Sequence, residues 1–451
     1  MSASRHESAD LVPAIAAVLG PLRPPVGDLT GMAEACSVPS PKCIRLNLQR
    51  GSQHPVDLPF RTRPVPWFPH AGRWVTDSDR PGGHLLYGTG AYYVQDAGSL
   101  LAVAAMNPLP GDLICDLCAS PGGKTVALLD QLGPTGGVLA NETVRSRLPP
   151  LLLNLARHGG TRFGVANLDP EHLAERAAGR FDGVLVDAPC SGQSLVARGR
   201  QGARAYHQRT IRHCAARQRR ILTAAARLVR PSGYMVYSTC TFSWAENEQQ
   251  VMDFLDRNRD WSIEPLEALS RWQSPPPAPQ GSYRLWPHLD GSAGAFACRL
   301  RHSGPGFGND SPNPVRGHFY ENFLPLSVGR WESPVIVRCT STRCEAWPED
   351  IPALLPWIGA SGPAVAFRRG KTWFPAYDLA MRRDGSFTPD RSVELNEEQA
   401  VAYLQGQPIE HCAIGWTVVR YKGWALGWGH GSGRRLANHL PVSARITRPY
   451  A

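Results

Sequence analysis

The hydrophobic positions of residues 91–301 form short apolar runs separated by longer stretches with helical spacing. Strands are predicted at 113–117, 137–140, 163–165, 184–186 and 234–237, with helices between them. One helix is predicted at 218–229, ending before Pro231, and another after Ser243, because Ser243 and Glu246 have capping-box spacing. This alternation predicts an α/β domain with a parallel sheet covered by helices on both faces.

Two less regular regions flank this domain. Residues 1–90 combine a helix near 11–20, a strand at 44–47 and loops rich in Pro and Trp. The stretch 11–20 is interpreted as a helix and not as a secretory signal, because Glu7 and Asp10 stand where such a signal is positively charged. Dense Gly and Pro predict a linker at 303–315. Residues 316–451 contain a strand candidate at 416–421 and a Gly-rich turn region at 427–433.

The composition is typical of a globular protein in a reducing compartment. Of 451 residues, 42% are hydrophobic and 19% charged, and no apolar run is long enough to span a bilayer, so no membrane association is expected. Eleven scattered cysteines predict reduced thiols and a cytoplasmic location. Cys115 and Cys118 have CxxC spacing but lack a second pair, so no metal site is expected. The net charge of +10 suits a polyanionic partner.

Positive charge is concentrated between Asp187 and Glu246, where the sequence has no acidic residue. A solvated helix face is the simpler explanation of such a strip. We favour a phosphate-binding rim, because the charge has a single sign and lies between the reactive motifs described next. The arginines of the strip are Arg198, Arg200, Arg204, Arg209, Arg212, Arg217, Arg219, Arg220, Arg227 and Arg230.

A glycine-rich loop at 116–125 follows the first predicted strand and precedes a helix. Its glycine pair would let the backbone approach a nucleotide, and the helix N-terminus offers unpaired N–H groups. Glu142, at the end of the next strand, is placed to hold ribose hydroxyls, and Asp169, at the end of the third, to reach an adenine amino group. The alternatives are a tight strand-to-helix turn for the loop and a surface carboxylate for Glu142.

Two cysteine motifs end the next two strands, one from Asp187 to Cys190 and one closing at Cys240. Carboxyl ends of parallel strands share one edge, so both cysteines are expected in one crevice. Carbon 5 of cytosine becomes nucleophilic only after a thiolate adds at carbon 6, and a second group must assist release. Asp187 is suitably placed as the acid at N3, and the arginine strip would lower a thiol pKa. The alternative to a catalytic role is that both cysteines are small buried hydrophobic residues.

These motifs, with those at 93–99, 246–248 and 284–288, occur in the order of the Nop/Sun family of RNA cytosine-5 methyltransferases, which the chain resembles over about residues 40–301. The resemblance implies a Rossmann-like domain at 91–302 that uses S-adenosyl-L-methionine. It implies catalysis by Cys240 as nucleophile, Cys190 as the cysteine aiding release, and Asp187. It also implies cofactor contacts from Cys118, Ala119, Ser120, Pro121, Gly122, Gly123, Lys124, Glu142, Asp169 and Asp187.

The C-terminal part resembles, more loosely, the extension of the bacterial small-subunit rRNA enzyme of this family, at 371–375, 402–406, 426–429 and 438–441. That similarity implies a β-rich, PUA-like RNA-binding region at 316–451, alongside a small N-terminal RNA-binding α/β domain at 1–90. The expected partner is ribosomal RNA or a ribosomal subunit, with transfer RNA as the alternative, and the expected state is a monomer.

The sequence departs from the family pattern in two places. The family usually continues with Thr-Gly after Ser191-Gly192, whereas this chain has Gln193-Ser194-Leu195, so the substrate-side loop is expected to be reshaped. Pro149 and Pro150 are expected to interrupt the helix after Glu142. Two other classes of protein would differ from this sequence in these motifs. An amino-nitrogen methyltransferase would need no cysteines, and a non-catalytic RNA-binding assembly protein would lack Cys240 or the glycines.

Overall fold

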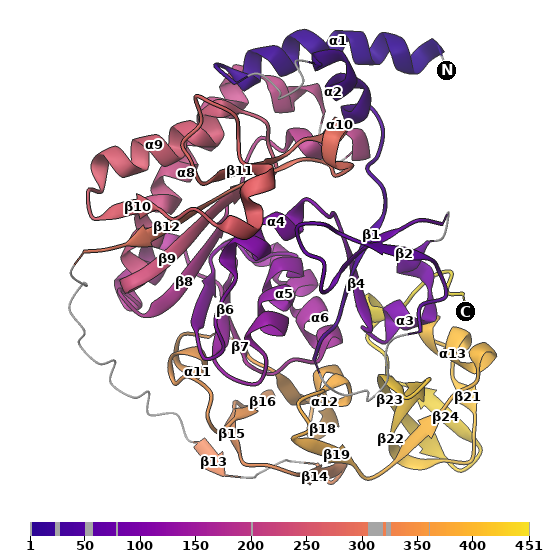
Figure 1. Ribbon diagram of the computed structural model, residues 1–451. Helices are drawn as coiled ribbons and strands as arrows, with labels where there is room; N and C mark the ends of the chain where they lie inside the picture. The colour runs from indigo at the N-terminus through magenta and orange to yellow at the C-terminus, as the bar shows by residue number, and fades with distance from the viewer. Residues whose placement is uncertain are drawn as a thin grey trace.

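The fold is described from a computed structural model of the chain (Figure 1). It describes residues 2–22, 28–49, 57–77, 80–199, 202–304, 319–321, 326–359 and 361–450. Arg200 and positions 305–315 of the predicted linker lie outside these ranges. Within the described ranges, no helix combines the length and apolar character needed to cross a bilayer.

A mixed sheet forms the centre of the molecule, and its strands follow the order β10-β12-β9-β8-β5-β6-β7, with β11 paired to β12. The five strands β5 to β9 run parallel, and β12 is antiparallel to β9. The predicted strands are confirmed, each within the bounds of an observed strand or one residue beyond it. The bounds are β5 Leu113–Asp116, β6 Gly137–Asn141, β7 Phe163–Ala166, β8 Phe181–Asp187, β9 Val229–Thr239, β10 Trp261–Ile263, β11 Ser282–Leu285 and β12 Ala295–His302.

Helices cover both faces of this sheet, as the alternating pattern predicts (Figure 1). One face packs against α4 (Ser99–Met106), α5 (Gly123–Leu132) and α6 (Leu148–His158), which contribute apolar side chains to one core. The other face packs against α7 (Pro170–Arg176), α8 (Gln208–Leu228) and α9 (Glu248–Arg257), which contribute to a second core. The central region is therefore a doubly wound α/β domain.

Three local predictions in this domain are corrected. Pro149 and Pro150 do not interrupt a helix but lie in the first turn of α6, where a proline has no intrahelical N–H bond to lose. The helix predicted at 218–229 begins earlier, at Gln208. Ser243 makes no side-chain capping bond, because the carboxylate of Glu246 points to Ser191 instead.

The N-terminal region forms a small antiparallel sheet of order β2-β3-β1-β4. Its strands are β1 Cys43–Leu46, β2 Thr62–Pro64, β3 Gly72–Val75 and β4 Tyr92–Gln95. The helix predicted near 11–20 is part of α1 (Ser2–Leu19), which packs with α2 (Leu29–Cys36). Side chains of both helices share a core with Tyr206 and Phe242 of the central domain, so the N-terminal region is fixed beside the cysteine loops.

Two five-stranded sheets follow in the C-terminal region, at the lower edge of Figure 1, together with a two-stranded sheet of β14 (Gly329–Trp331) and β19 (Phe387–Pro389). The first has the order β13-β15-β16-β17-β18 and the second β20-β22-β23-β24-β21. Their strands are β13 Phe319–Glu321, β15 Val335–Cys339, β16 Arg343–Pro348, β17 Ala364–Arg369, β18 Thr372–Pro375, β20 Ser392–Glu394, β21 Ile409–Glu410, β22 Ile414–Tyr421, β23 Trp424–Ser432 and β24 Arg435–Asn438. The first sheet contacts the central domain, where Trp347 Nε1 donates to the carbonyl of Phe163 at 2.7 Å.

The predicted glycine-rich turn at 427–433 is wrong for most of its length, because these residues belong to β23. The glycines serve close packing of neighbouring strands. A Cβ at Gly429 would lie 2.5 Å from the side chain of Leu436, and one at Gly431 would lie 2.1 Å from the carbonyl oxygen of Ala413. The many glycines of this segment therefore reflect close packing within the sheet and not a turn.

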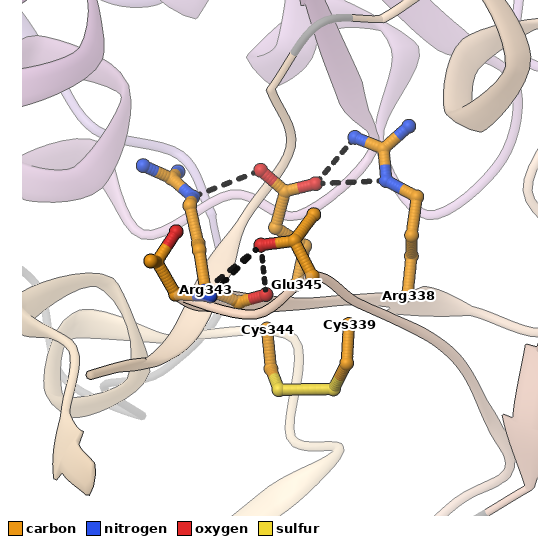
Figure 2. Close-up of a disulfide and its surroundings, with 7 residues drawn as sticks. Arg338, Cys339, Arg343, Cys344 and Glu345 are labelled. Carbon is orange, nitrogen blue, oxygen red and sulfur yellow. Dashed lines mark hydrogen bonds and ion pairs between the residues drawn. A yellow bond between two sulfur atoms is a disulfide. The ribbon is translucent and has the colours of Figure 1, made fainter. Parts of the chain in front are cut away.

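Reduced thiols were expected throughout, but Cys339 and Cys344 form a disulfide between β15 and β16 (Figure 2). The two cysteines are direct cross-strand partners, a register that their spacing in the sequence does not reveal. Beside the disulfide, the buried carboxylate of Glu345 lies between the guanidinium groups of Arg338 and Arg343 (Figure 2). The other nine cysteines are free.

Candidate active site

A cavity of about 790 Å³ opens at the carboxyl ends of β5, β8 and β9. The register of β8 and β9 pairs Asp187 with Ser238, so the loops that follow carry Cys190 and Cys240 into the same space. Most of the predicted site residues line this cavity: Cys118, Ala119, Ser120, Pro121, Gly123, Lys124, Asp187, Cys190 and Cys240. Gly122 is the N-cap of α5, with a φ of 107° that favours glycine.

The sulfur atoms of the two cysteines lie 3.3 Å apart. A hydrogen bond from Cys190 lowers the pKa of the Cys240 thiol, and a bond from Ser194 and the charge of Lys124 add to this effect against burial. The bond to Cys240 raises the pKa of Cys190 well above its ordinary value, and burial and the Glu246 carboxylate act in the same direction. Of the two sulfurs, Cys240 is therefore the one that ionises more readily.

Asp187 is held between two donors. Its Oδ2 accepts from Lys124 Nζ at 2.6 Å, and its Oδ1 accepts from Ser238 Oγ at 2.9 Å. Asp187 raises the pKa of Lys124 against the effect of burial, so this ammonium keeps its proton. The pair places one acidic and one basic side chain close enough to influence the pKa of Cys240.

Glu246, from the short helical turn η5 (Trp244–Glu246), joins the two cysteine loops. Its carboxylate accepts from the backbone N–H of Ser191 at 2.9 Å and from Ser191 Oγ at 2.6 Å. The Ser191 hydroxyl also lies 2.9 Å from Thr241 Oγ1, and Gln218 Nε2 of α8 donates to Glu246 at 3.0 Å. Because every one of these side chains is buried, the network fixes the residues directly after Cys190 and Cys240 relative to each other.

Glu142 and Asp169, two of the carboxylates predicted to contact the cofactor, line a neighbouring cavity of about 220 Å³. Cys118, Arg147 and Pro189 line both cavities. Glu142 is buried, and its Oε2 makes no hydrogen bond, although it lies 3.3 Å from Arg147 Nη1. A buried acceptor of this kind fits a ribose hydroxyl, so these residues fit the adenosine part of S-adenosylmethionine. Asp169 uses one oxygen to cap α7 through the N–H of Glu171.

In the folded chain, acidic side chains from other segments neutralise part of the positive charge of the arginine strip. Four of its members pair with acids from other segments: Arg198 with Asp96, Arg219 with Asp253, Arg220 with Glu171 and Arg230 with Asp182. The cation that lowers the pKa of Cys240 is Lys124, so the expected role of the arginines toward the thiol is corrected. Other members, such as Arg209 and Arg212, are exposed on α8 and remain candidates for a phosphate-binding rim.

The unusual segment Gln193-Ser194-Leu195 supports the Cys240 loop. Gln193 is buried, and its side chain accepts from the N–H of Phe242 at 2.8 Å and donates to the carbonyl of Ala205 at 3.1 Å. The backbone N–H of Ser194 donates to the carbonyl of Cys240 at 3.2 Å. The segment in which the sequence departs from the family pattern thus holds the loop that carries Cys240.

Sequence reasoning missed the buried network around Glu246. The sequence places Glu246 in a capping box and in the motif at 246–248, and Gln218 only at the start of a predicted helix. One signal was available, because Gln218 is polar but has the helical spacing of the apolar positions Cys214, Ile221 and Leu222. A polar residue on a buried helix face needs a partner, and here the partner is the site.

A parallel sheet with a glycine-rich loop after β5 and carboxylates after β6 and β7 is the arrangement of a domain that binds an adenosine-containing cofactor, and the comparisons with known proteins identify it as a methyltransferase domain. A solved structure of a methyltransferase homolog from Pyrococcus horikoshii is similar, with 28% identity and a TM-score of 0.54, covering 61% of this chain and 91% of that chain. The structure of NSun6 from the same organism, with SFG, has a TM-score of 0.55 at 19% identity, covering 65% of this chain and 98% of that chain, which shows the shared fold.

Three family models match consecutive parts of the chain. They are the N-terminal domain of 16S rRNA methyltransferase RsmF at 26–97, 16S rRNA methyltransferase RsmB/F at 103–301, and the methyltransferase RsmF PUA domain at 390–446. Proteins named ribosomal RNA small subunit methyltransferase F are similar over most of their length. The one from Aeromonas hydrophila is 29% identical, covering 90% of this chain and 91% of its own, and the one from Erwinia tasmaniensis is 28% identical, covering 84% of each. The chain belongs to the RsmB/F family and is an RNA methyltransferase that uses S-adenosylmethionine.

Proposed function

We propose that this enzyme methylates carbon 5 of a cytosine in the ribosomal RNA of the small subunit, through a covalent adduct with Cys240. The observation that carries the proposal is the pair of sulfur atoms 3.3 Å apart beside the cofactor cavity, with the lowered pKa on Cys240. A methyl transfer to nitrogen would need neither sulfur. The names of the full-length relatives support ribosomal RNA as the substrate.

In the proposed reaction, the thiolate of Cys240 adds to carbon 6 of the cytosine. The bond between Cys240 Sγ and carbon 6 forms, the double bond between carbons 5 and 6 opens, and its electron pair moves through the ring toward N3. During this addition, Lys124 Nζ passes a proton to the Asp187 carboxylate, which it contacts at 2.6 Å, and Asp187 delivers that proton to N3. Bound S-adenosylmethionine supplies an electrophilic methyl group to carbon 5.

Release requires the removal of the proton on carbon 5 and the departure of Cys240 from carbon 6. Cys190 lies within hydrogen-bond distance of the Cys240 sulfur, so it is placed to pass its thiol proton to that sulfur as the bond to carbon 6 breaks and, as the thiolate that remains, to take the proton from carbon 5. The proton on N3 returns through Asp187 to Lys124. Glu142, Asp169 and the loop that contains Lys124 would hold the cofactor beside the same two sulfurs. All of these residues come from one chain, which supports a monomer, and a ribosomal RNA substrate supports action in the cytoplasm.

Bisulfite sequencing tests the proposal directly. RNA from cells that lack the protein is compared with RNA from cells that express either the wild-type chain or the Cys240→Ala variant. We expect one or more protected cytosines in small-subunit ribosomal RNA that disappear without the protein and return only with the wild-type chain. If the protected cytosines change only in transfer RNA, the substrate is transfer RNA and not ribosomal RNA. If no cytosine changes in any RNA, carbon-5 methylation is rejected.

A further inference from the structure

An aromatic surface joins the two C-terminal sheets. It consists of Phe367 and Phe374 from the β17–β18 hairpin, Trp416 and His430 from β22 and β23, and His439 after β24. The cavity at the cysteine pair has none of these five residues in its lining. They form a separate surface, which the catalytic mechanism does not use.

The rings of this aromatic surface follow one another in continuous contact. Phe367 and Phe374 are stacked with centroids 5.6 Å apart, and Phe374 meets the edge of Trp416 at 6.0 Å. Trp416 in turn contacts His439 at 4.5 Å and His430 at 5.0 Å. The pairing of Trp416 with His430 across β22 and β23 fixes both rings on the same side of the sheet.

The aromatic surface is open to solvent. His430 and His439 are exposed, and the rings of Phe367, Phe374 and Trp416 are partly exposed. Ile414 precedes Trp416 by two positions on β22, which places both on one face, and its side chain is 67% exposed. A run of aromatic and aliphatic side chains that meets water costs free energy unless a partner covers it.

The charge around these rings has a single sign. The hairpin that carries Phe367 and Phe374 contains Arg368, Arg369 and Lys371, all exposed, and no acidic residue between positions 367 and 374. The guanidinium of Arg369 lies 5.1 Å from the ring centre of Phe367 and 5.8 Å from that of Phe374. Burial lowers the pKa of His439, and the nearby His430 and Arg369 lower it further, so the surroundings of this ring are cationic.

We propose that the aromatic surface binds an unpaired stretch of RNA, whose bases stack on the rings while its phosphates meet the cations of the β17–β18 hairpin. The inference rests on the proposed RNA substrate and adds a second contact site for it. Two of the five rings come from the hairpin, which lies outside the PUA match at 390–446, so the site is composite.

Accessible rings favour single-stranded RNA over other polyanions. A base stacks on an aromatic ring only when its own face is free, and a duplex buries the faces of its bases. Duplex RNA would be held through the cations alone, with the same affinity whether or not the rings are present. An acidic peptide would also use the cations and would leave the stacked pair of phenylalanines without a function.

Binding of a fluorescent single-stranded RNA of about 10 nucleotides to the full chain, measured by anisotropy, tests the inference. Trp416→Ala should raise the Kd about tenfold for this RNA and leave the Kd for a duplex of the same length nearly unchanged. Arg369→Ala should weaken binding of both RNAs and reduce the slope of log K against log salt by about 1. His430→Ala should raise the Kd for the single strand only. Arg259→Ala is the matched control, because Arg259 is 82% exposed and far from the rings in the sequence.

Trp416 also packs against the core of this region, so Arg369→Ala and His430→Ala, at exposed positions, decide the outcome if Trp416→Ala unfolds. Unchanged single-strand affinity in the folded variants would overturn the inference, and so would equal losses for single strand and duplex on removal of a ring. Binding is measured without methyl transfer. A chain that binds through these residues but forms no 5-methylcytosine would therefore refute the proposed function alone.

Discussion

The sulfur atoms of Cys190 and Cys240, at 3.3 Å, are too close for a pyrimidine ring to lie between them. A ring sandwiched by two atoms needs roughly 3.5–4.0 Å on each side. The two sulfurs must therefore approach the base from the same side, and not from opposite faces. In this arrangement Cys190 stays next to the bond between Cys240 and carbon 6 after the adduct forms, where it can serve the elimination step.

The two cysteines should have separable roles. We expect Cys240→Ala to abolish methylation, because no other thiolate reaches carbon 6. Cys190→Ala should leave a covalent protein–RNA complex, because the adduct forms but is not released. A shifted band on a denaturing gel, present for Cys190→Ala and absent for Cys240→Ala and for the double variant, is the expected result. Wild-type turnover in both single variants would exclude covalent catalysis by this pair.

Lys124 should set the pH dependence of the nucleophile. In the wild-type chain, Lys124 and the bond from Cys190 lower the pKa of Cys240, so the reactive thiolate is already present at a pH below the ordinary thiol range. Lys124→Met removes the charge and should raise this pKa, which moves the ascending limb of reactivity to higher pH. The measurement is the alkylation rate of the Cys240 peptide by iodoacetamide as a function of pH, followed by mass spectrometry. Lys371→Met, at an exposed position outside the cavity, is the control, and identical profiles for the two variants would contradict the role of Lys124.

Glu246 should hold the loops after the two cysteines in place. Glu246→Gln replaces a carboxylate that accepts from Ser191 and Gln218 with an amide that presents a donor to one of them, which should lower the free energy of unfolding by about 2 kcal/mol. We expect a fall in kcat of about tenfold with little change in KM for RNA, because the cysteines are misplaced after binding.

Ser191→Ala tests the same contact from the other side and should lower kcat in the same direction. Glu398→Gln, at an exposed position on α13 (Glu397–Leu404), is the control and should behave like the wild type. A loss of thermal stability in Glu246→Gln without any change in kcat would mean that the network serves folding alone.

Glu142 should contribute to cofactor affinity. Its buried Oε2 makes no hydrogen bond within the chain, so a ribose hydroxyl would gain a charge-assisted bond there. Glu142→Ala should raise the Kd for S-adenosylmethionine about tenfold, measured by calorimetry in the absence of RNA. Glu175→Ala changes an exposed carboxylate on the neighbouring α7 and should leave the Kd unaltered. Equal affinities of the two variants would remove Glu142 from the cofactor site.

The sequence by itself determined the central domain and its chemistry. Apolar runs of strand length before the glycine-rich loop, Asp187 and Cys240 were sufficient to predict the strands, because burial on both faces leaves a local hydrophobic signal. Because the carboxyl ends of parallel strands lie at one edge of the sheet, the predicted strands also indicated which residues line the cavity.

Only the tertiary structure decided which charges surround those residues. The arginine strip looked uniformly positive, yet Asp96, Glu171, Asp182 and Asp253 come from other segments to neutralise part of it. Glu246 looked like a helix cap and instead binds Ser191, 55 positions earlier. Long-range pairing of polar groups depends on which elements pack together, and a linear pattern of hydrophobic positions carries no record of those partners.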